Sequence, residues 1–115
     1  MLYDLKLFQK VYDFLLWIKP TVQRFAKVHK YSLGLQLENE TLELLKSIIR
    51  ANFKRENKKD FIEECAVHYE TVKVLIRLTK DFSGSGGLSL KQYEFAAGQL
   101  NEIGKLLSGW HRRFS

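Results

Sequence analysis

The sequence predicts an all-α protein: an antiparallel, up-down-up-down four-helix bundle that forms one domain over residues 1–115. Three observations support this. Apolar residues recur at three- and four-residue spacing in four segments, no stretch alternates in the manner of a strand, and the first three segments are joined by short connections. With 115 residues, 45% of them hydrophobic, the chain is long enough to bury one core.

The first helix is expected over residues 3–28. Its buried side repeats at helical spacing through Leu7, Val11, Phe14, Ile18, Val22 and Phe25. Phe8, Tyr12 and Leu15 form a flanking stripe, so the apolar face is wide, as in a helix that packs against several neighbours. Pro20 lies inside this segment and predicts a kink or a local break.

The second helix is expected over residues 33–54, with Ser32 as its N-cap. Its predicted buried side consists of Leu37, Thr41, Leu44, Leu45, Ile48 and Ile49. Acidic residues come early in this segment and basic residues late, an order that complements the helix dipole.

The third helix is expected over residues 58–82, with Asn57 as its cap. Its main apolar face is predicted to contain Phe61, Cys65, Tyr69, Val72, Leu75, Ile76, Thr79 and Phe82. Residues 83–87 read Ser-Gly-Ser-Gly-Gly, a composition typical of a flexible connection, natural or engineered.

The fourth helix is expected over residues 89–110, because Ser89 and Gln92 have the spacing of a capping box. Its apolar face is predicted to contain Tyr93, Ala96, Ala97, Leu100, Ile103, Leu107 and Trp110. Glycine destabilises a helix interior, so Gly98 and Gly104 need an explanation. Either a neighbouring helix approaches closely at these positions, or the helix simply tolerates the glycines. Residues 111–115 are expected to fray.

Composition narrows the classes of function. The net charge of +6 favours polyanionic partners such as nucleic acid, without specificity for one of them. No apolar run is long enough for a membrane span, and the first residues lack the pattern of a secretory signal. The single cysteine, Cys65, has no partner for an internal disulfide. We therefore expect a cytoplasmic protein.

The sequence contains no constellation typical of catalysis. His29, His68 and His111 are scattered, and Cys65 with His68 supplies only two possible metal ligands. The glycine cluster lacks phosphate-loop spacing, and Glu63 and Glu64 are adjacent, so they point in different directions on a helix. We therefore expect neither a metal, nor a cofactor, nor enzymatic activity.

Two features indicate interaction surfaces. Trp17 lies in the middle of a charged stripe on the first helix, and tryptophan is enriched in interface hot spots. The third helix carries a second apolar stripe, away from its core face, formed by Val67, Val74 and Leu78. We expect these four residues at an oligomer interface. The alternatives are an incidental exposed ring or one covered by the C-terminal tail for Trp17, and one wide buried face for the stripe.

Basic residues form two rows that can follow a phosphate backbone. Lys46, Arg50 and Lys54 are spaced four apart on the second helix. Lys73, Arg77 and Lys80 follow at four and three on the third. The alternative for both rows is an ordinary solvated helix face.

Several stretches in the same order resemble the accessory variability determinant of diversity-generating retroelements, and more broadly the four-helix-bundle proteins of ribosomal RNA intervening sequences. The resemblance covers about Phe8 to Trp110. It rests on YSLG (31–34), VKVLIRLTKD (72–81), LSLKQYEFA (88–96) and LNEIGKLLSGW (100–110).

The resemblance implies a homopentameric barrel of bundles without catalytic activity. Such a protein binds the retroelement's reverse transcriptase and RNA or DNA, and supports mutagenic reverse transcription of a template RNA. The basic residues in matching stretches are Lys73, Arg77, Lys80, Lys91 and Lys105, with a looser match for Arg50, Lys54 and Arg55. Residues 83–87 depart from the family, which usually has basic and apolar residues there. The alternatives are an intervening-sequence protein with a structural role and a designed bundle.

Overall fold

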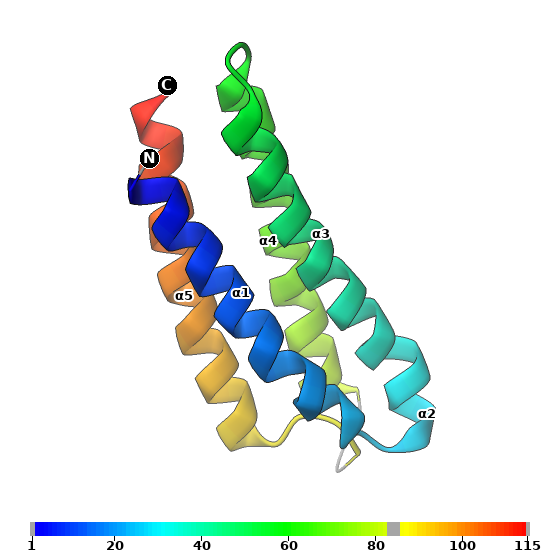
Figure 1. The fold of residues 1–115 in the computed structure, drawn as a ribbon. Helices are drawn as coiled ribbons and strands as arrows, with labels where there is room; N and C mark the ends of the chain where they lie inside the picture. The colour runs from blue at the N-terminus through cyan, green and yellow to red at the C-terminus, as the bar shows by residue number, and fades with distance from the viewer. Residues whose placement is uncertain (1, 83–85, 115) are drawn as a thin grey trace.

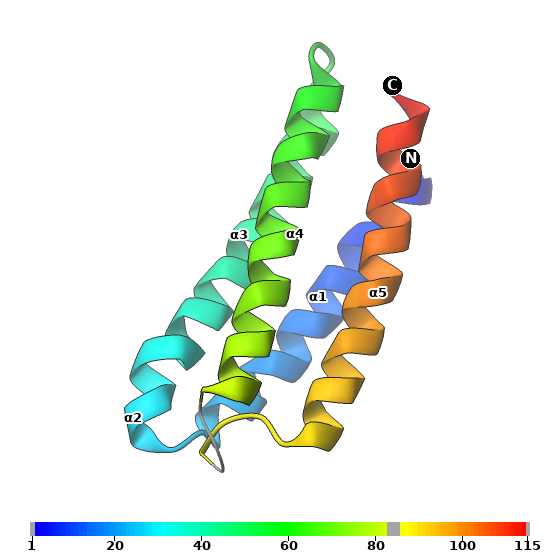
Figure 2. The same ribbon diagram turned by 180° about the vertical axis from the view of Figure 1, so that it is seen from behind.

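In a computed structural model, which describes residues 2–82 and 86–114, four long helices run alternately up and down (Figure 1). They are α1 (Leu2–Gln23), α3 (Leu35–Phe53), α4 (Lys58–Asp81) and α5 (Leu90–Arg113). α1 packs beside α3 and α5, and α4 packs beside the same two helices, so α1 and α4 lie on one diagonal (Figure 2). The described residues contain no strand, and the predicted all-α bundle is confirmed.

The first helix ends earlier than the predicted residue 28. α1 passes through Pro20 and stops at Gln23. The amides of Arg24 and Phe25 donate to carbonyls three residues back, which closes the last turn. The Ala26 amide then donates to the Gly86 carbonyl at 2.7 Å. This hydrogen bond takes the place of a helical one at Ala26 and joins the end of α1 to the connection between α4 and α5. The predicted flexible connection, residues 83–87, lies outside the described residues at positions 83–85.

The prediction that the second helix starts at residue 33 with a Ser32 cap is wrong. A short helix, α2 (Lys27–His29), leads into a π-helical turn, η1 (Lys30–Gly34), and then into α3. The Ser32 hydroxyl lies inside this run and donates to the Val28 carbonyl at 2.8 Å. Gly34 is buried, and a Cβ atom there would lie 2.7 Å from Val22 Cγ1, so only glycine lets η1 pack this closely on α1.

The remaining boundaries agree more closely with the prediction. Asn57 precedes α4 as expected, but it adopts a left-handed conformation (φ 57°) and its side chain makes no cap hydrogen bond. The capping box of α5 is confirmed, because Ser89 Oγ accepts from the Gln92 amide and Gln92 Oε1 accepts from the Ser89 amide. α5 continues to Arg113, so the prediction that the chain frays from residue 111 is wrong.

The core lies between the four long helices and contains nearly all the predicted apolar residues. Every predicted core residue of the first helix is buried. Ile49, Phe82 and Ala97 were also expected inside, but they are exposed, because each lies just past the edge of its helix's buried face. Ile62 is buried instead and was missed. The buried hydroxyls of Thr41, Ser47 and Thr79 donate to carbonyls of their own helices, so they carry no desolvation penalty.

Candidate nucleic-acid interface

The two predicted basic rows lie on different halves of the bundle. His68 Nδ1 of α4 lies 2.6 Å from Glu40 Oε1 of α3, which sets the register of these antiparallel helices. The row Lys46–Arg50–Lys54 comes after Glu40 in α3 and therefore lies beside the first half of α4. The row Lys73–Arg77–Lys80 comes after His68 in α4. Because the two helices are antiparallel, this second row extends toward the other end of the bundle. The two rows do not form one surface.

Most of the basic side chains in the two rows lie close to an acidic side chain of the same helix. Lys46 Nζ lies 3.1 Å from Glu43 and Lys73 Nζ lies 3.6 Å from Glu70. Arg77 Nε and Lys80 Nζ lie 3.4 and 3.5 Å from Asp81. Lys80 also lies over the Tyr93 ring, near the exposed Lys91 at the start of α5. These residues therefore offer a polyanion less uncompensated charge than the sequence pattern predicted.

At the opposite end, basic residues from α3, α4 and α5 lie close together. Lys54 Nζ lies 4.8 Å from the Phe61 ring centroid. Arg50, which precedes Lys54 in the chain, and Arg55, which follows it, are both exposed. Lys58 donates to the carbonyls of Ala51 and Asn52, which caps α3, and lies over Phe114 beyond the end of α5. The predicted residues of the α3–α4 turn thus lie near the basic last turn of α5.

The groove between α4 and α5 brings two predicted residues together. Lys73 and Lys105 line it, joined by Arg112, which sequence reasoning had assigned to a frayed tail. The groove encloses about 460 Å³, and its other lining residues are Tyr69, Glu70, Asn101, Gly104 and Ser108. A seven-residue spacing puts Lys105 and Arg112 on one helix face, and this is the signal that could have identified Arg112.

Lysines of α1 extend this charge around α5. Lys10 Nζ donates to Glu102 Oε2 at 2.5 Å. This hydrogen bond, together with the charges of Lys10, Lys105 and Lys6, lowers the pKa of the exposed Glu102 carboxyl below its ordinary value of 4.5. We call Lys6, Lys10, Lys73, Lys105 and Arg112 the α5 basic face. Its five cations come from α1, α4 and α5.

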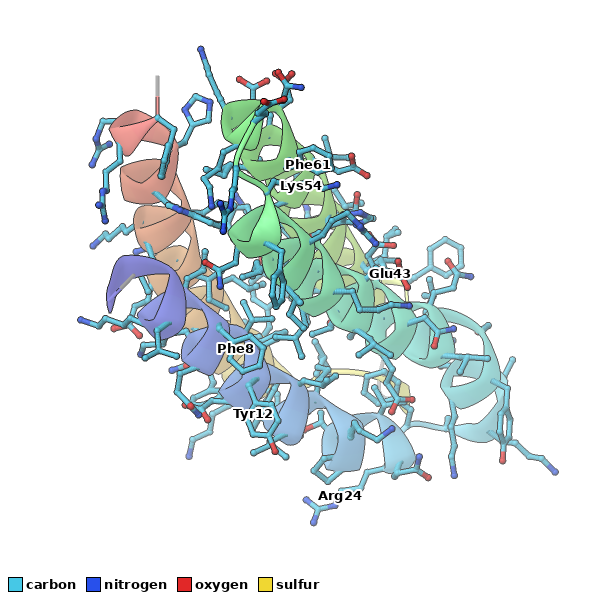
Figure 3. All side chains as sticks on the ribbon, turned by 45° about the horizontal axis from the view of Figure 1, so that its top comes forward. Phe8, Tyr12, Arg24, Glu43, Lys54 and Phe61 are labelled. Carbon is cyan, nitrogen blue, oxygen red and sulfur yellow. The ribbon has the colours of Figure 1, made fainter. Side chains whose placement is uncertain are left out.

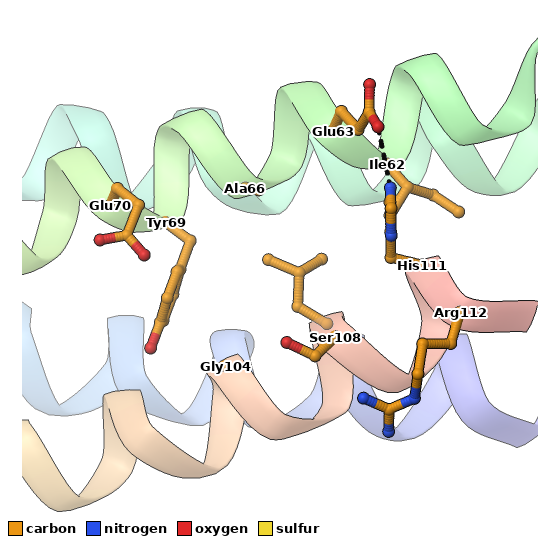
Figure 4. Close-up of a pocket in the computed structure, with 10 residues that line it drawn as sticks. Ile62, Glu63, Ala66, Tyr69, Glu70, Gly104, Ser108, His111 and Arg112 are labelled. Carbon is orange, nitrogen blue, oxygen red and sulfur yellow. Dashed lines mark hydrogen bonds and ion pairs between the residues drawn. The ribbon is translucent and has the colours of Figure 1, made fainter. Parts of the chain in front are cut away.

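A second hollow of about 390 Å³ adjoins the groove and is more apolar (Figure 4). Tyr69 reaches from α4 toward Gly104 at one end of it. At the other end His111 reaches from α5 toward Glu63, and His111 Nε2 lies 2.9 Å from Glu63 Oε2. Ile62, Ala66 and Leu107 supply its apolar lining. Burial, and secondarily the charge of Glu70, raises the pKa of the Tyr69 phenol.

Trp17 is predicted at an oligomer interface, and within one chain its side chain also packs against a neighbouring helix. Trp17 is half-buried between α1 and α5, and its ring centroid lies 4.9 Å from that of Phe95 and 5.9 Å from that of Phe14. The helical pattern placed Trp17 among charges, but it carried no information about which helix lies alongside. Trp17 therefore serves the packing of the chain itself.

Two exposed apolar surfaces lie on different sides of the bundle. The α4 apolar stripe consists of the predicted residues Val67, Val74 and Leu78; Val67 is 63% exposed and Val74 is 57% exposed. The second surface was missed. Its residues are exposed on the neighbouring helices α1 and α3, and one of them, Tyr12, stacks on Phe8 (Figure 3). We call it the α1–α3 apolar face, and it comprises Leu5, Tyr12, Leu16, Leu42, Ile49 and Phe53.

The side chains considered as metal ligands serve packing. Cys65 is fully buried and its Sγ donates to the Phe61 carbonyl, and burial raises the thiol pKa to about 11. His68 contacts Glu40 instead. Within residues 2–82 and 86–114, no group of three or more histidine, cysteine or acidic side chains is placed to hold a metal ion. None of the described helices combines the length and apolar character needed to cross a membrane.

These features define a class: a helical-bundle protein with a basic face and exposed apolar side chains. The chain matches the bAvd-like family model over residues 5–114, and it therefore belongs to the bAvd-like family. This confirms the resemblance to the accessory variability determinant and supports an accessory role, in general terms non-catalytic. Comparison with curated proteins gave no match, and neither did comparison with solved structures.

Proposed function

We propose that this chain is a non-catalytic accessory protein of a diversity-generating retroelement. It binds the element's reverse transcriptase and nucleic acid, and so supports mutagenic reverse transcription of a template RNA. The family match over residues 5–114 carries this proposal. The α5 basic face adds a physical basis, because cations gathered on one surface bind a phosphate backbone through release of its counterions.

The two apolar surfaces support an assembly of several chains. They differ in residues and lie on different sides of the bundle, so a contact between copies would join the α4 apolar stripe of one chain to the α1–α3 apolar face of the next. Such head-to-tail contacts close into a ring when the rotation between subunits permits. The family resemblance suggests that the ring has five subunits, which would repeat the α5 basic face around it.

The test compares two triple variants. K73Q/K105Q/R112Q removes the basic residues of the α4–α5 groove. K46Q/R77Q/K80Q removes the same number of charges from the two basic rows, at residues that do not line the groove. Binding to a labelled single-stranded RNA is followed by fluorescence anisotropy between about 50 and 200 mM salt. The groove variant should lower the slope of log affinity against log salt by about 2, since each lost phosphate contact contributes about 0.7.

The control variant should change the slope by less than half as much. Pull-down of a diversity-generating retroelement reverse transcriptase from the same genome tests the partner separately. RNA binding that is equally weakened by both variants would remove the groove from the interface. Failure of the wild-type chain to bind either the polymerase or RNA would contradict the proposed function itself.

A further inference from the structure

The space between α4 and α5 combines two chemically different halves, and phosphate binding accounts for only one of them. The polar half is lined by Lys73, Asn101 and Lys105. The apolar half is lined by Ile62, Ala66 and Leu107. Tyr69, Glu70, Gly104, Ser108 and Arg112 border both, so the two halves form one continuous groove. A ligand that fills it needs an apolar part and an anionic part next to each other.

The apolar half has the size and lining of a small-molecule site. Its volume of about 390 Å³ lies within the range of about 300–1,000 Å³ that is typical of ligand pockets. Ile62 and Leu107 are almost fully buried, and they form a floor that water cannot hydrogen-bond. The aromatic side chains of Tyr69 and His111 stand at its two ends (Figure 4). A flat aromatic group fits such surroundings, because aromatic rings and apolar side chains both pack against its faces.

The shape at the centre of the groove depends on Gly104. A Cβ atom at this position would lie 2.9 Å from Tyr69 Cζ, so any larger residue would displace the ring. With glycine there, the Tyr69 ring extends across the groove at the boundary between the two halves. The ring is therefore positioned to contact a base in the apolar half while a phosphate attached to that base reaches Lys105.

The charges assign an orientation to the ligand. The polar half is lined by three cations, Lys73, Lys105 and Arg112, and by one carboxylate, that of Glu70, which lies 3.6 Å from Lys73 Nζ. Glu63 lines only the apolar half. A phosphate is attracted to the three cations and repelled by the Glu63 carboxylate. A base in the apolar half can donate its amino or ring N–H groups to that carboxylate, or to Glu70 on the border.

We propose that this groove holds one unpaired nucleotide, with its base in the apolar half and its phosphate between Lys73, Lys105 and Arg112. The inference rests on the proposed function and deepens it, because it names the form of nucleic acid that is bound. In a duplex the bases are stacked and paired, so they cannot enter the hollow, whereas an unstacked base in a single strand can. The groove therefore selects single-stranded over double-stranded regions.

The decisive variant is Ser108→Trp. Ser108 is exposed and lines both halves, so an indole ring there fills the hollow while every cation remains and the core is undisturbed. Gln36→Trp places the same ring on an exposed position of α3 and serves as the matched control. Calorimetry measures the binding of a ten-nucleotide RNA, the duplex of the same sequence, guanosine monophosphate and inorganic phosphate. Circular dichroism verifies that both variants keep the helical fold.

We expect S108W to weaken binding of the single strand about tenfold or more and to leave binding of the duplex unchanged, while Q36W changes neither. In the wild-type chain, the methyl resonances of Ile62 and Leu107 should shift with the single strand and remain in place with phosphate. If guanosine monophosphate gives the same shifts, the groove also accepts free nucleotides; if only the strand does, the flanking phosphates are required.

The inference is overturned if single strand and duplex bind equally and S108W alters neither, a result that leaves nucleic-acid binding intact. If the wild-type chain binds neither oligonucleotide, the proposed function fails. The inference then fails as well, unless guanosine monophosphate alone shifts the Ile62 and Leu107 methyl resonances.

Discussion

Gly104 of α5 lies directly against the phenol ring of Tyr69 of α4, and a Cβ atom at position 104 would come within 2.9 Å of Tyr69 Cζ. Gly98, six residues earlier on the same helix, has no atom within 4 Å of the corresponding position. The sequence treats the two glycines alike, since both interrupt the same apolar pattern. The structure distinguishes them, because only one faces a neighbouring helix.

This difference predicts opposite effects on stability. Gly98→Ala should raise the free energy of unfolding by about 0.5–1 kcal/mol, because alanine favours the helix and meets no neighbour. Gly104→Ala should lower it by about 1 kcal/mol, because displacing the Tyr69 ring outweighs the same gain. Urea denaturation measures both, and adding Tyr69→Phe to Gly104→Ala should recover part of the loss. Equal stabilisation by the two alanines would contradict the close contact.

The thiol of Cys65 should be nearly inert in the folded protein. Burial raises its pKa from 9.0 to about 11, so the reactive thiolate is about a hundredfold rarer at pH 8 than in an exposed cysteine. Iodoacetamide labelling, followed by mass spectrometry, should therefore be slower than in the urea-unfolded chain by about that factor or more. Labelling at similar rates in both states would show that Cys65 is accessible.

The Lys10–Glu102 contact predicts a small dependence of stability on pH. The folded-state pKa of Glu102 lies below its ordinary value, so the carboxylate stabilises the fold above that ordinary value. This contribution is lost as the pH falls through the lowered pKa. Glu102→Gln should therefore be less stable than wild type at neutral pH, with the difference disappearing in acid.

Urea titrations at a series of pH values check this prediction. The matched background is Lys10→Gln, in which the effect of Glu102→Gln should shrink, because the hydrogen bond that contributes most is already absent. High salt should also reduce the effect, since the pair is exposed. If the stability difference between wild type and Glu102→Gln persists unchanged in acid, the charge of Glu102 does not cause it.

The exposed apolar surfaces predict an assembly that a single charge can disrupt. Val74→Asp on the α4 apolar stripe, or Ile49→Asp on the α1–α3 apolar face, should dissociate the oligomer, because each buries an unpaired carboxylate at the contact. Light scattering during size-exclusion chromatography should give five times the mass of one chain for wild type and one chain mass for these variants. Val28→Asp adds the same charge at an exposed position outside both surfaces and should leave the assembly intact. A monomeric wild-type chain would contradict the proposed ring.

The sequence by itself determined the class of fold and most of the core. The apolar repeat from Leu7 to Phe25 identified the buried side of the first helix, and Ser89 with Gln92 located the start of α5. Both signals are local: a helix turns every 3.6 residues, and a capping box is complete within one turn. They depend on neighbours in the chain, and a single sequence contains them in full.

Only the tertiary structure decided which residues share a surface. The Trp17–Phe95 contact, the separation of the two basic rows and the meeting of Lys73, Lys105 and Arg112 all depend on the register between helices. Helical periodicity shows which side of each helix faces inward, but not how far one helix is shifted along another. That shift is set by packing contacts between distant residues, such as Tyr69 against Gly104 and His68 against Glu40.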